Sequence, residues 1–202
     1  MKLTDAYAEL RRLGSEVLTT REAQAAWGVQ QRTASRRLRS LQEAGLVSRI
    51  RQGLWALDSQ IDPFKVAPYL TAPLPAYVSL WSALYRHGMI EQIPRSISVI
   101  SLDRTRRIPT ALGLYEIHHL APQLFLGFSV SGDDDYLASA EKALFDTVYI
   151  RAAAGGVAHF PELWIPADFN RAHFKQWSQR IESKRLRTLV RRRLREVTAT
   201  VR

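Results

Sequence analysis

Residues 19–45 read TTREAQAAWGVQQRTASRRLRSLQEAG and predict two helices joined by a short turn. Thr19 is followed three residues later by Glu22, which is the spacing of a capping box at a helix start. The first helix is expected to stop near Trp27-Gly28. The second helix, over 31–44, has three apolar residues at helical spacing that are expected to face a core: Ala34, Leu38 and Leu41.

Further patterns flank these two helices. An amphipathic helix is expected over residues 2–13, and a short extended segment follows at 17–18. After the helices, two apolar-alternating runs at 46–51 and 54–57 surround a glycine turn, which is the pattern of a hairpin. Helix, strand, helix, turn, helix and hairpin is the order of a winged helix-turn-helix, so the sequence predicts this domain over residues 1–57.

A second domain is expected over residues 62–202, after a boundary at 58–63. Helices are expected to begin at Asp62-Pro63 and to span 77–87, 136–153, 168–181 and 183–196, and strands to span 97–102, 107–110, 115–120 and 125–130. Short turns between the strands favour a mostly antiparallel sheet. The predicted fold class is α+β, with an N-terminal winged helix-turn-helix followed by a mixed α/β C-terminal domain that ends in helices.

The charge of the 202-residue chain is uneven. The net charge of +10 divides into +5 over 1–57, −4 over 58–170 and +9 over 171–202. Basic ends of this kind attract phosphate backbones. The chain has no cysteine, which excludes disulfides and thiolate metal sites. It has no apolar run of membrane-spanning length and no apolar signal core, so we expect a cytoplasmic protein without membrane partners.

The helix predicted over 31–44 is the main candidate for contacts with duplex DNA. Its arginines fall largely opposite the apolar stripe. In a helix-turn-helix this part of the chain meets base edges in the major groove, where Gln can pair with adenine and Arg with guanine. The candidate DNA-binding residues here are Gln30, Gln31, Arg32, Thr33, Ser35, Arg36, Arg37 and Arg39.

The predicted hairpin adds Arg49, Arg51 and Gln52 to the candidate DNA-binding residues. Basic residues at a wing tip usually contact the DNA backbone or the minor groove, which positions the protein without specifying a sequence. Trp27 and Trp55 are interpreted as core residues of the domain and not as groups that stack on bases.

The last predicted helix is both amphipathic and basic. Such a helix can bind nucleic acid, a membrane surface or an acidic partner, or it can simply keep the protein in solution. The candidates for auxiliary nucleic-acid contacts are Lys184, Arg185, Arg187, Arg191, Arg192 and Arg193.

Signals for catalysis are poor, and we expect no enzyme activity, no catalytic residues, no cofactor and no metal site. His118 and His119 are neighbours on a predicted strand, so they point to opposite faces and cannot chelate one metal; one is expected in the core and one on the surface. The run at 133–135, three aspartates, is typical of a loop or helix start. Glu141 and Asp146 lie too far around their helix to share a face. The phosphate-binding, dinucleotide-binding and nucleophile-elbow motifs are absent from the sequence.

Seven segments occur in an order that can be compared with known families: 53–57 (GLWAL), Asp62-Pro63, 77–88 (YVSLWSALYRHG), 92–94 (QIP), 115–120 (YEIHHL), 125–127 (FLG) and 138–146 (ASAEKALFD). With the predicted winged helix they cover most of the chain and resemble the AbiEi family of antitoxins of type IV toxin–antitoxin systems, which includes transcriptional regulators. One departure is mild, since Ala138-Ser139-Ala140 stands where the family usually has Ala-Thr-Pro or similar.

The resemblance implies a two-domain regulator that represses its own operon by binding operator repeats in its promoter. It also implies a C-terminal domain that opposes a nucleotidyltransferase-like toxin, by functional rather than stable physical interaction. It assigns DNA contacts to the helix and hairpin residues named above and identifies no antitoxin residues.

Two other hypotheses stay open at the level of sequence. The chain could be a metal-dependent nuclease whose winged helix targets it to DNA and whose second domain uses Asp135 or Glu141 with a divalent metal. It could also be a plain transcription factor whose second domain senses a ligand or a partner.

Overall fold

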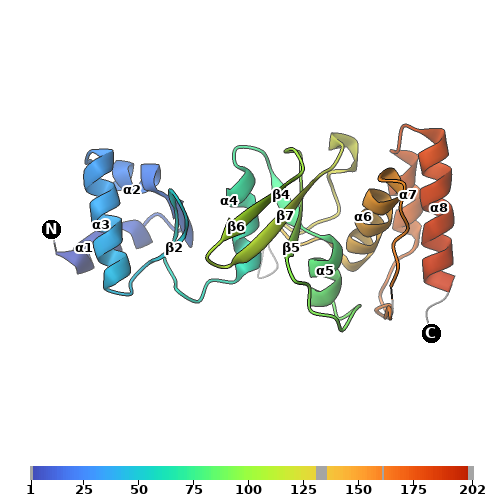
Figure 1. Cartoon of the computed structure of the whole chain (residues 1–202), viewed down its shortest axis with the longest axis horizontal. Coiled ribbons are helices and arrows are strands. Elements are labelled where there is room, and N and C mark those ends of the chain that lie inside the picture. Colours follow the sequence, from blue (N-terminus) through green and yellow to red (C-terminus); the bar gives the residue numbers. More distant parts are fainter. Residues whose placement is uncertain (1, 131–135, 161, 200–202) are drawn as a thin grey trace. The chain divides into compact units, whose positions relative to one another are not determined.

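The computed structural model describes residues 2–130, 136–160 and 162–199. The fold class is α+β, with two separate and mostly antiparallel sheets (Figure 1). The chain divides into two compact units, the first made of residues 1–66 and 109–113 and the second of 67–108 and 114–202. The division after Val66 lies a few residues beyond the boundary expected at 58–63.

The first unit contains the helices and strands that the sequence predicts for the N-terminal region. Ala34, Leu38 and Leu41 are completely buried, as their spacing predicts, in a core that also holds Leu10 and Trp27. The elements are α1 (Leu3–Arg11), β1 (Val17–Thr19), α2 (Thr20–Trp27), α3 (Gln31–Glu43), β2 (Ser48–Arg51), β3 (Leu54–Ala56) and the short 3₁₀ helix η1 (Pro63–Val66).

Local chemistry fixes both ends of α2. The Thr19 amide donates to Glu22 Oε2 at 2.6 Å, and the Glu22 amide donates to Thr19 Oγ1 at 3.2 Å, so the capping box is confirmed. At the other end Gly28 takes the left-handed conformation, with φ of 58°. Glycine adopts that conformation without the strain that a Cβ brings, so the chain turns there and α3 begins three residues later.

Thr19→Ala is expected to lower the free energy of unfolding of the first unit by about 1 kcal/mol, because the Glu22 amide loses its acceptor. Urea unfolding of the full chain, combined with hydrogen exchange of the α2 amides, measures this loss. Ser59→Ala, at an exposed residue of the same unit, is the control and should change little. Equal stability of the two variants would contradict the role of the cap.

The three strands of the first unit form a small antiparallel sheet in the order β1-β3-β2. The pairing of β2 with β3 is irregular between Arg49 and Arg51, and Gly53 forms the turn with φ of 79°. The indole of Trp55 donates to Thr20 Oγ1 at 2.9 Å, and the indole of Trp27 donates to the Ala6 carbonyl at 3.1 Å. Both tryptophans are buried, so their interpretation as core residues is confirmed.

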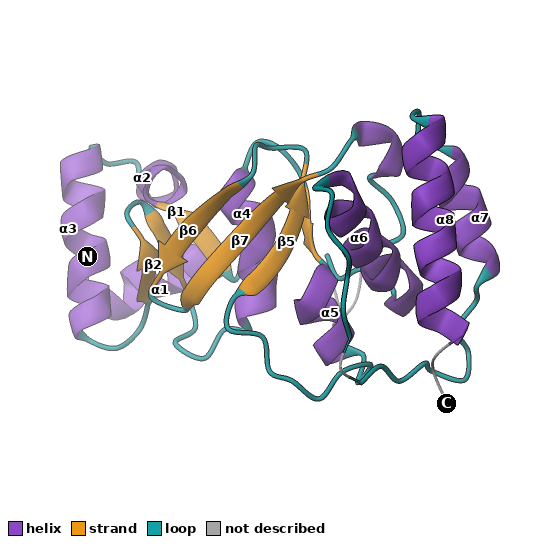
Figure 2. Ribbon diagram, turned by 45° about the vertical axis from the view of Figure 1, so that its right-hand side comes forward, coloured by secondary structure: helices purple, strands orange, loops and turns teal. Residues whose placement is uncertain are grey.

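The second unit places helices beside a four-stranded sheet of order β4-β5-β7-β6 (Figure 2). β4 pairs with β5 antiparallel, whereas β5 pairs with β7 parallel. After β5 the chain first forms β6 at the edge of the sheet and then returns as β7 between β6 and β5. The elements that lie wholly or mostly in this unit are α4 (Ala67–Thr71), β4 (Ala76–Val78), α5 (Leu80–Arg86), β5 (Ile97–Ser101), β6 (Arg106–Thr110), β7 (Gly113–His119), the 3₁₀ helix η2 (Pro122–Leu124), α6 (Ala140–Ala153), α7 (Ala172–Gln179) and α8 (Lys184–Ala199).

Two predictions that concern the sheet region are wrong, one for a helix and one for a strand. The helix expected over 77–87 begins only at Leu80, because Tyr77 and Val78 pair with β5 as part of β4. The strand expected over 125–130 is not formed. Instead, the Phe128 ring stacks on Tyr77 with centroids 4.4 Å apart, and the backbone of 127–129 bonds that of 136–139 around an isolated bridge from Phe128 to Ala138. Aromatic packing and these few backbone bonds therefore hold the segment without a regular strand.

Two predicted helix starts are also wrong. The helix expected from Tyr136 begins at Ala140, because Ser139 is its cap and accepts a hydrogen bond from the Lys142 amide at 3.2 Å. Asp168 does not cap the following helix, since α7 begins four residues later and has Arg171 at the cap position. In the described residues no helix has both the length and the apolar character needed to cross a membrane.

Candidate nucleic-acid interface

The α3 helix of the first unit turns a basic face to solvent. At about 100° of rotation per residue, Arg32, Arg36 and Arg39 lie within an arc of roughly 60° on the side opposite the buried stripe. All three side chains are exposed. Within 2–130, 136–160 and 162–199, none of the three makes an ion pair or a side-chain hydrogen bond. Their charge is therefore uncompensated inside the unit.

The start of α3 adds open backbone donors to this face. Gln30 is the cap residue but makes no side-chain cap bond, and its carbonyl accepts from the Thr33 and Ala34 amides. The amides of Gln31 and Arg32 therefore point out of the helix end, where an anion such as a phosphate is favoured. Of the other predicted contact residues here, Gln30 and Gln31 are exposed, and Thr33 and Ser35 are half-buried.

Two of the predicted contact arginines lie over core tryptophans. The Arg37 guanidinium is 5.7 Å from the ring centroid of Trp27, and the Arg49 guanidinium is 6.0 Å from that of Trp55. Cation–π contacts of this kind hold a guanidinium in place while its outer N–H groups stay open. Arg37 is half-buried, so it is the less accessible of the two.

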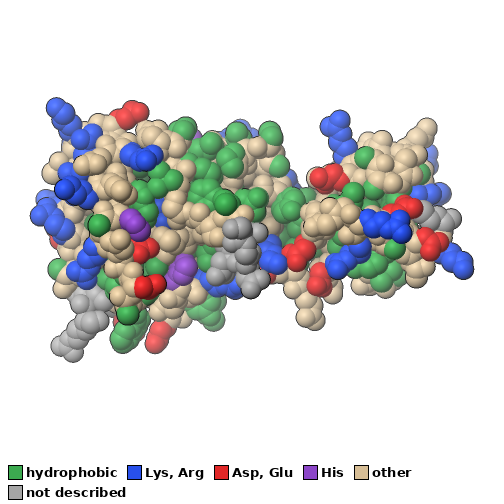
Figure 3. All heavy atoms as spheres, turned by 180° about the vertical axis from the view of Figure 1, so that it is seen from behind, with side chains coloured by type: hydrophobic (Ala, Val, Ile, Leu, Met, Phe, Trp, Pro, Cys, Tyr) green, Lys and Arg blue, Asp and Glu red, His purple; other side chains and the backbone are tan. Residues whose placement is uncertain are grey.

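The hairpin of β2 and β3 carries the remaining candidates. Arg51 and Gln52 are exposed at the turn, directly before Gly53. Arg49 Nε donates to the Arg51 carbonyl at 3.4 Å, across the irregular part of β2. Arg49, itself a candidate for DNA contact, therefore also supports the backbone of the hairpin. In the space-filling view basic side chains protrude from the surface of each unit (Figure 3).

In the second unit, the basic residues of α8 do two different things. Arg187 donates twice to the Ile181 carbonyl, at 2.9 and 2.7 Å, and Arg191 donates to the buried Ser178 Oγ at 2.7 Å. Arg191 therefore ties α8 to α7, and Arg187 ties α8 to the segment between the two helices. Both Arg192 and Arg193 pair with Glu196, whereas Lys184 and Arg185 are exposed and make no ion pair among the described residues.

The second unit also contains a buried polar cluster that the sequence did not reveal. Asp146 accepts hydrogen bonds from Tyr77 Oη at 2.9 Å and Ser79 Oγ at 2.8 Å, and its other oxygen pairs with Lys142 Nζ. Lys142, Asp146, Tyr77 and Ser79 are completely buried. Burial, together with the charge of Asp146, raises the pKa of Tyr77 well above its usual value, so Tyr77 donates as a neutral phenol.

Aromatic rings enclose the buried amine of Lys142. Its Nζ lies 5.6 Å from the ring centroid of Tyr77, 5.4 Å from that of Phe145 and 5.8 Å from that of Trp177. Burial lowers the pKa of Lys142, and the charge of Asp146 opposes that shift. All four side chains of the cluster are completely buried, so Lys142 and Asp146 form an ion pair of the core.

Of the two residues proposed for a nuclease, only Glu141 lies within the described residues, and its carboxylate is bonded inside the second unit. Glu141 Oε1 accepts from the Asn170 amide at 2.7 Å, and Oε2 accepts from Ser139 Oγ at 2.9 Å. Burial raises the pKa of Glu141, but these hydrogen bonds outweigh it and the pKa lies below its usual value. Asp135, with the rest of 133–135, lies outside the described residues. Where the structure describes the chain, no three His, Asp or Glu side chains group in a way that could hold a metal ion.

The two adjacent histidines, His118 and His119, differ less in burial than expected. His119 is exposed, as one of the pair was expected to be, but His118 is half-buried and not part of the core. Its partial burial lowers its pKa, so it is mostly neutral near pH 7.

Three of the segments on which the family resemblance rests, 77–88, 125–127 and 138–146, meet at the buried cluster. Tyr77 and Ser79 come from 77–88, Gly127 from 125–127, and Lys142 and Asp146 from 138–146. The Lys142 side chain passes so close to Gly127 that an added Cβ would lie 3.1 Å from Lys142 Cδ. The spacing of Lys142 and Asp146, four residues apart on a helix, is the one signal of the pair that the sequence offers.

In comparisons with known proteins, no family model matches the sequence and no curated protein matches it. Function is therefore inferred from the chain's own residues and their arrangement.

Proposed function

We propose that the chain binds duplex DNA in a sequence-specific way, and that its first unit is a winged helix-turn-helix. In this proposal α3 enters the major groove and the β2–β3 hairpin is the wing. The observation that carries it is the face of Arg32, Arg36 and Arg39, which is exposed, opposite the core and without an ion pair to any residue that the structure describes. A rigid helix presenting several free guanidinium groups suits guanine edges and phosphates.

The candidate residues divide into three roles. Gln30, Gln31 and Arg32 stand at the helix start, where side chains of a recognition helix reach base edges. Arg51 and Gln52 at the turn are suited to the DNA backbone or the minor groove. Thr33, Ser35, Arg36, Arg37, Arg39 and Arg49 complete the proposed contact set along α3 and β2.

The basic helix of the second unit is proposed to add affinity without sequence preference. Lys184 and Arg185 are the best placed for this role, because both are exposed and neither makes an ion pair with a described residue. Arg187 and Arg191 contribute less, because their guanidinium groups are already bonded to Ile181 and Ser178.

Arg36→Ala combined with Arg39→Ala is expected to weaken binding to the preferred DNA site by about 100-fold at fixed salt. The reason is that each guanidinium contributes roughly 1–3 kcal/mol to site recognition. The measurement is fluorescence anisotropy on a fragment of the gene's own promoter, with a scrambled fragment beside it. The melting temperature should stay unchanged, since both side chains are exposed.

The matched control removes two charges from the other unit, as Lys184→Ala combined with Arg185→Ala. It should weaken binding to both fragments alike, and it should lower the salt dependence by roughly one unit of slope for each phosphate that is no longer neutralised. If the α3 variant keeps full affinity and preference for the promoter site, the recognition-helix assignment is wrong.

We further propose, from the sequence resemblance, that DNA binding represses the protein's own operon and that the second unit opposes a nucleotidyltransferase-like toxin. The simplest test is the neighbouring gene. A downstream reading frame of that class should arrest growth when expressed alone and should be tolerated when this chain is co-expressed. Tolerance of the reading frame without this chain would remove the antitoxin role and leave a DNA-binding regulator.

A further inference from the structure

A recess opens in the second unit beside Trp81, and none of its lining residues belongs to the proposed DNA contacts of α3. It has a volume of about 210 Å³ and is lined by Trp81, Ile90, Glu91, Gln92 and Glu162. A second hollow, of about 260 Å³, shares Trp81 and Gln92 and extends along Ile93 and Pro94. The indole of Trp81 is thus bordered by open space in both hollows.

The backbone at the start of α5 separates this recess from the buried cluster. Leu80 has φ of 54°, a left-handed conformation that is uncommon for a residue other than glycine. Before it, Ser79 is completely buried and bonds Asp146; after it, Trp81 is only half-buried. The Phe160 ring lies 5.1 Å from the Trp81 ring and supports it.

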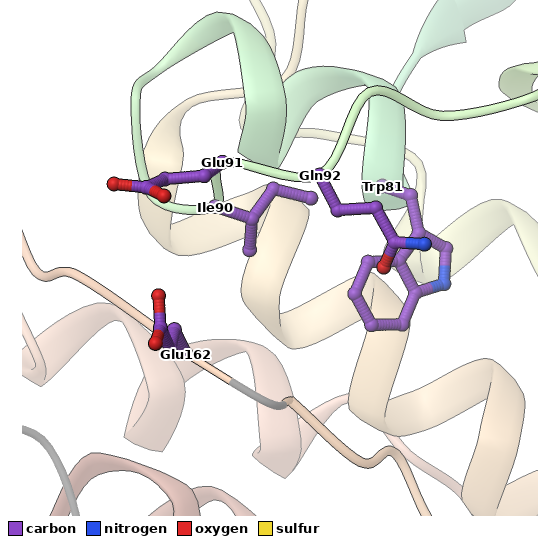
Figure 4. A pocket seen from close by; sticks show the side chains of 5 residues that line it. All are labelled: Trp81, Ile90, Glu91, Gln92 and Glu162. Carbon is purple, nitrogen blue, oxygen red and sulfur yellow. The ribbon is translucent and has the colours of Figure 1, made fainter.

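The recess is apolar in its floor and acidic at its edge. Ile90 is 5% exposed and forms part of the floor. Figure 4 shows the carboxylates of Glu91 and Glu162 on one side of Ile90, with Gln92 and Trp81 on the other. Both carboxylates are exposed, and in the part of the chain that the structure describes neither makes an ion pair or a hydrogen bond.

We propose that this recess binds an arginine side chain of a partner protein. An arginine offers an apolar stem that can lie along Trp81 and Ile90, and N–H groups at its far end for Glu91 and Glu162. The two unpaired carboxylates disfavour a phosphate or another anion in the same place. A purely apolar ligand would leave both carboxylates without a partner.

The surface around the recess indicates a protein rather than a small free cation. Ile93, in the adjoining hollow, is 70% exposed, and Trp164 is 53% exposed. The Trp164 amide donates to the Met89 carbonyl at 2.8 Å, which holds this tryptophan beside the segment that carries Ile90 and Glu91. Large exposed apolar side chains next to a cation site are typical of an interface, where Trp and Arg supply much of the binding energy.

The test uses the full chain labelled with ¹⁵N. The indole signal of Trp81, identified by its loss in Trp81→Phe, is followed while Nα-acetyl-arginine amide is added. A saturable shift is expected, and the neutral isostere Nα-acetyl-citrulline amide should give little or none. A peptide with leucine on each side of the arginine should bind more tightly than the amide alone.

Variants sharpen the result. Glu91→Gln combined with Glu162→Gln should weaken arginine binding about fivefold or more at low salt, whereas Asp168→Asn, an exposed acid of the same unit, should leave it unchanged. Equal shifts with arginine and citrulline, or no shift, would overturn the proposal. A peptide no tighter than the amide would mean a small cation instead of a protein.

Sedimentation of the wild-type chain alone separates a second copy from another protein. If the chain forms dimers that the double glutamine variant dissolves, the occupant is a second copy and the proposed partner is wrong. DNA affinity serves as an independent readout, because the recess shares no residue with α3. Loss of arginine binding with promoter binding intact is the expected outcome for the double variant.

Discussion

Asp146→Ala is expected to lower the free energy of unfolding of the second unit by about 3–5 kcal/mol, the range for breaking a buried ion pair from one side. The substitution leaves the Lys142 ammonium without its counter-charge in a completely buried position. It also removes the acceptor of Tyr77 Oη and Ser79 Oγ, which belong to completely buried residues. Hydrogen exchange of the α6 amides, with urea unfolding of the full chain, measures the loss in this unit.

Two further variants identify the cause. Asp146→Leu combined with Lys142→Met replaces the pair by apolar side chains and should recover much of the loss, because the attraction within a buried pair does little more than offset its own desolvation. Asp168→Asn removes an exposed carboxylate and should change stability by less than about 0.5 kcal/mol. A double variant no more stable than Asp146→Ala would show that the hydrogen bonds or the packing matter more than the uncompensated charge.

The contrast between the two units shows what a sequence can reveal. The helices of the first unit follow from signals that act within a few residues: the capping box of Thr19 and Glu22, and Gly28 at the end of α2. The buried stripe of α3 follows from helical spacing alone. Each local preference agrees with the tertiary structure there, so reading the chain in order gives the elements correctly.

In the second unit, tertiary contacts override the local signals. Tyr77 and Val78 fit a helical pattern, yet they form β4 because β5 supplies their backbone partners. The 125–130 segment alternates like a strand, yet it forms no regular strand, because its rings pack on Tyr77 and its backbone makes only a few bonds to 136–139. Contacts between residues far apart in the chain, here Tyr77 and Asp146, leave no periodic trace in the sequence.

The difference between local signals and contacts made only in the folded chain also applies to the candidate sites. The arginines of α3 could be named from the sequence, because an exposed helix face is defined by spacing around a predicted buried stripe. The structure adds that Arg37 and Arg49 lie over tryptophans, and that Arg187 and Arg191 bind carbonyl and hydroxyl oxygens of the unit. The recess beside Trp81 could not be predicted, because Glu162 and Trp81 are brought together only by the fold.

Gly127→Ala is expected to cost about 2–5 kcal/mol of stability in the second unit, for two separable reasons. Gly127 has φ of 78°, which costs an alanine roughly 1–2 kcal/mol. The new Cβ would lie 3.1 Å from both Lys142 Cδ and Trp177 Cζ2, and the cost of such overpacking is typically about 1–3 kcal/mol. Lys142 cannot swing away, because its amine is held by Asp146 among three aromatic rings.

Gly155→Ala separates these two costs. Gly155 has φ of 75°, nearly the same backbone strain, but nothing lies within 4 Å of its added Cβ. The Gly155→Ala variant should therefore lose only the stability that the positive φ costs an alanine. The difference in unfolding free energy between the two variants then measures the packing around Lys142. If both variants lose the same amount, the Lys142 stem and Trp177 yield freely to a methyl group. The buried ion pair would then be less rigidly enclosed than its contacts indicate, and Asp146→Ala should fall at the low end of its range.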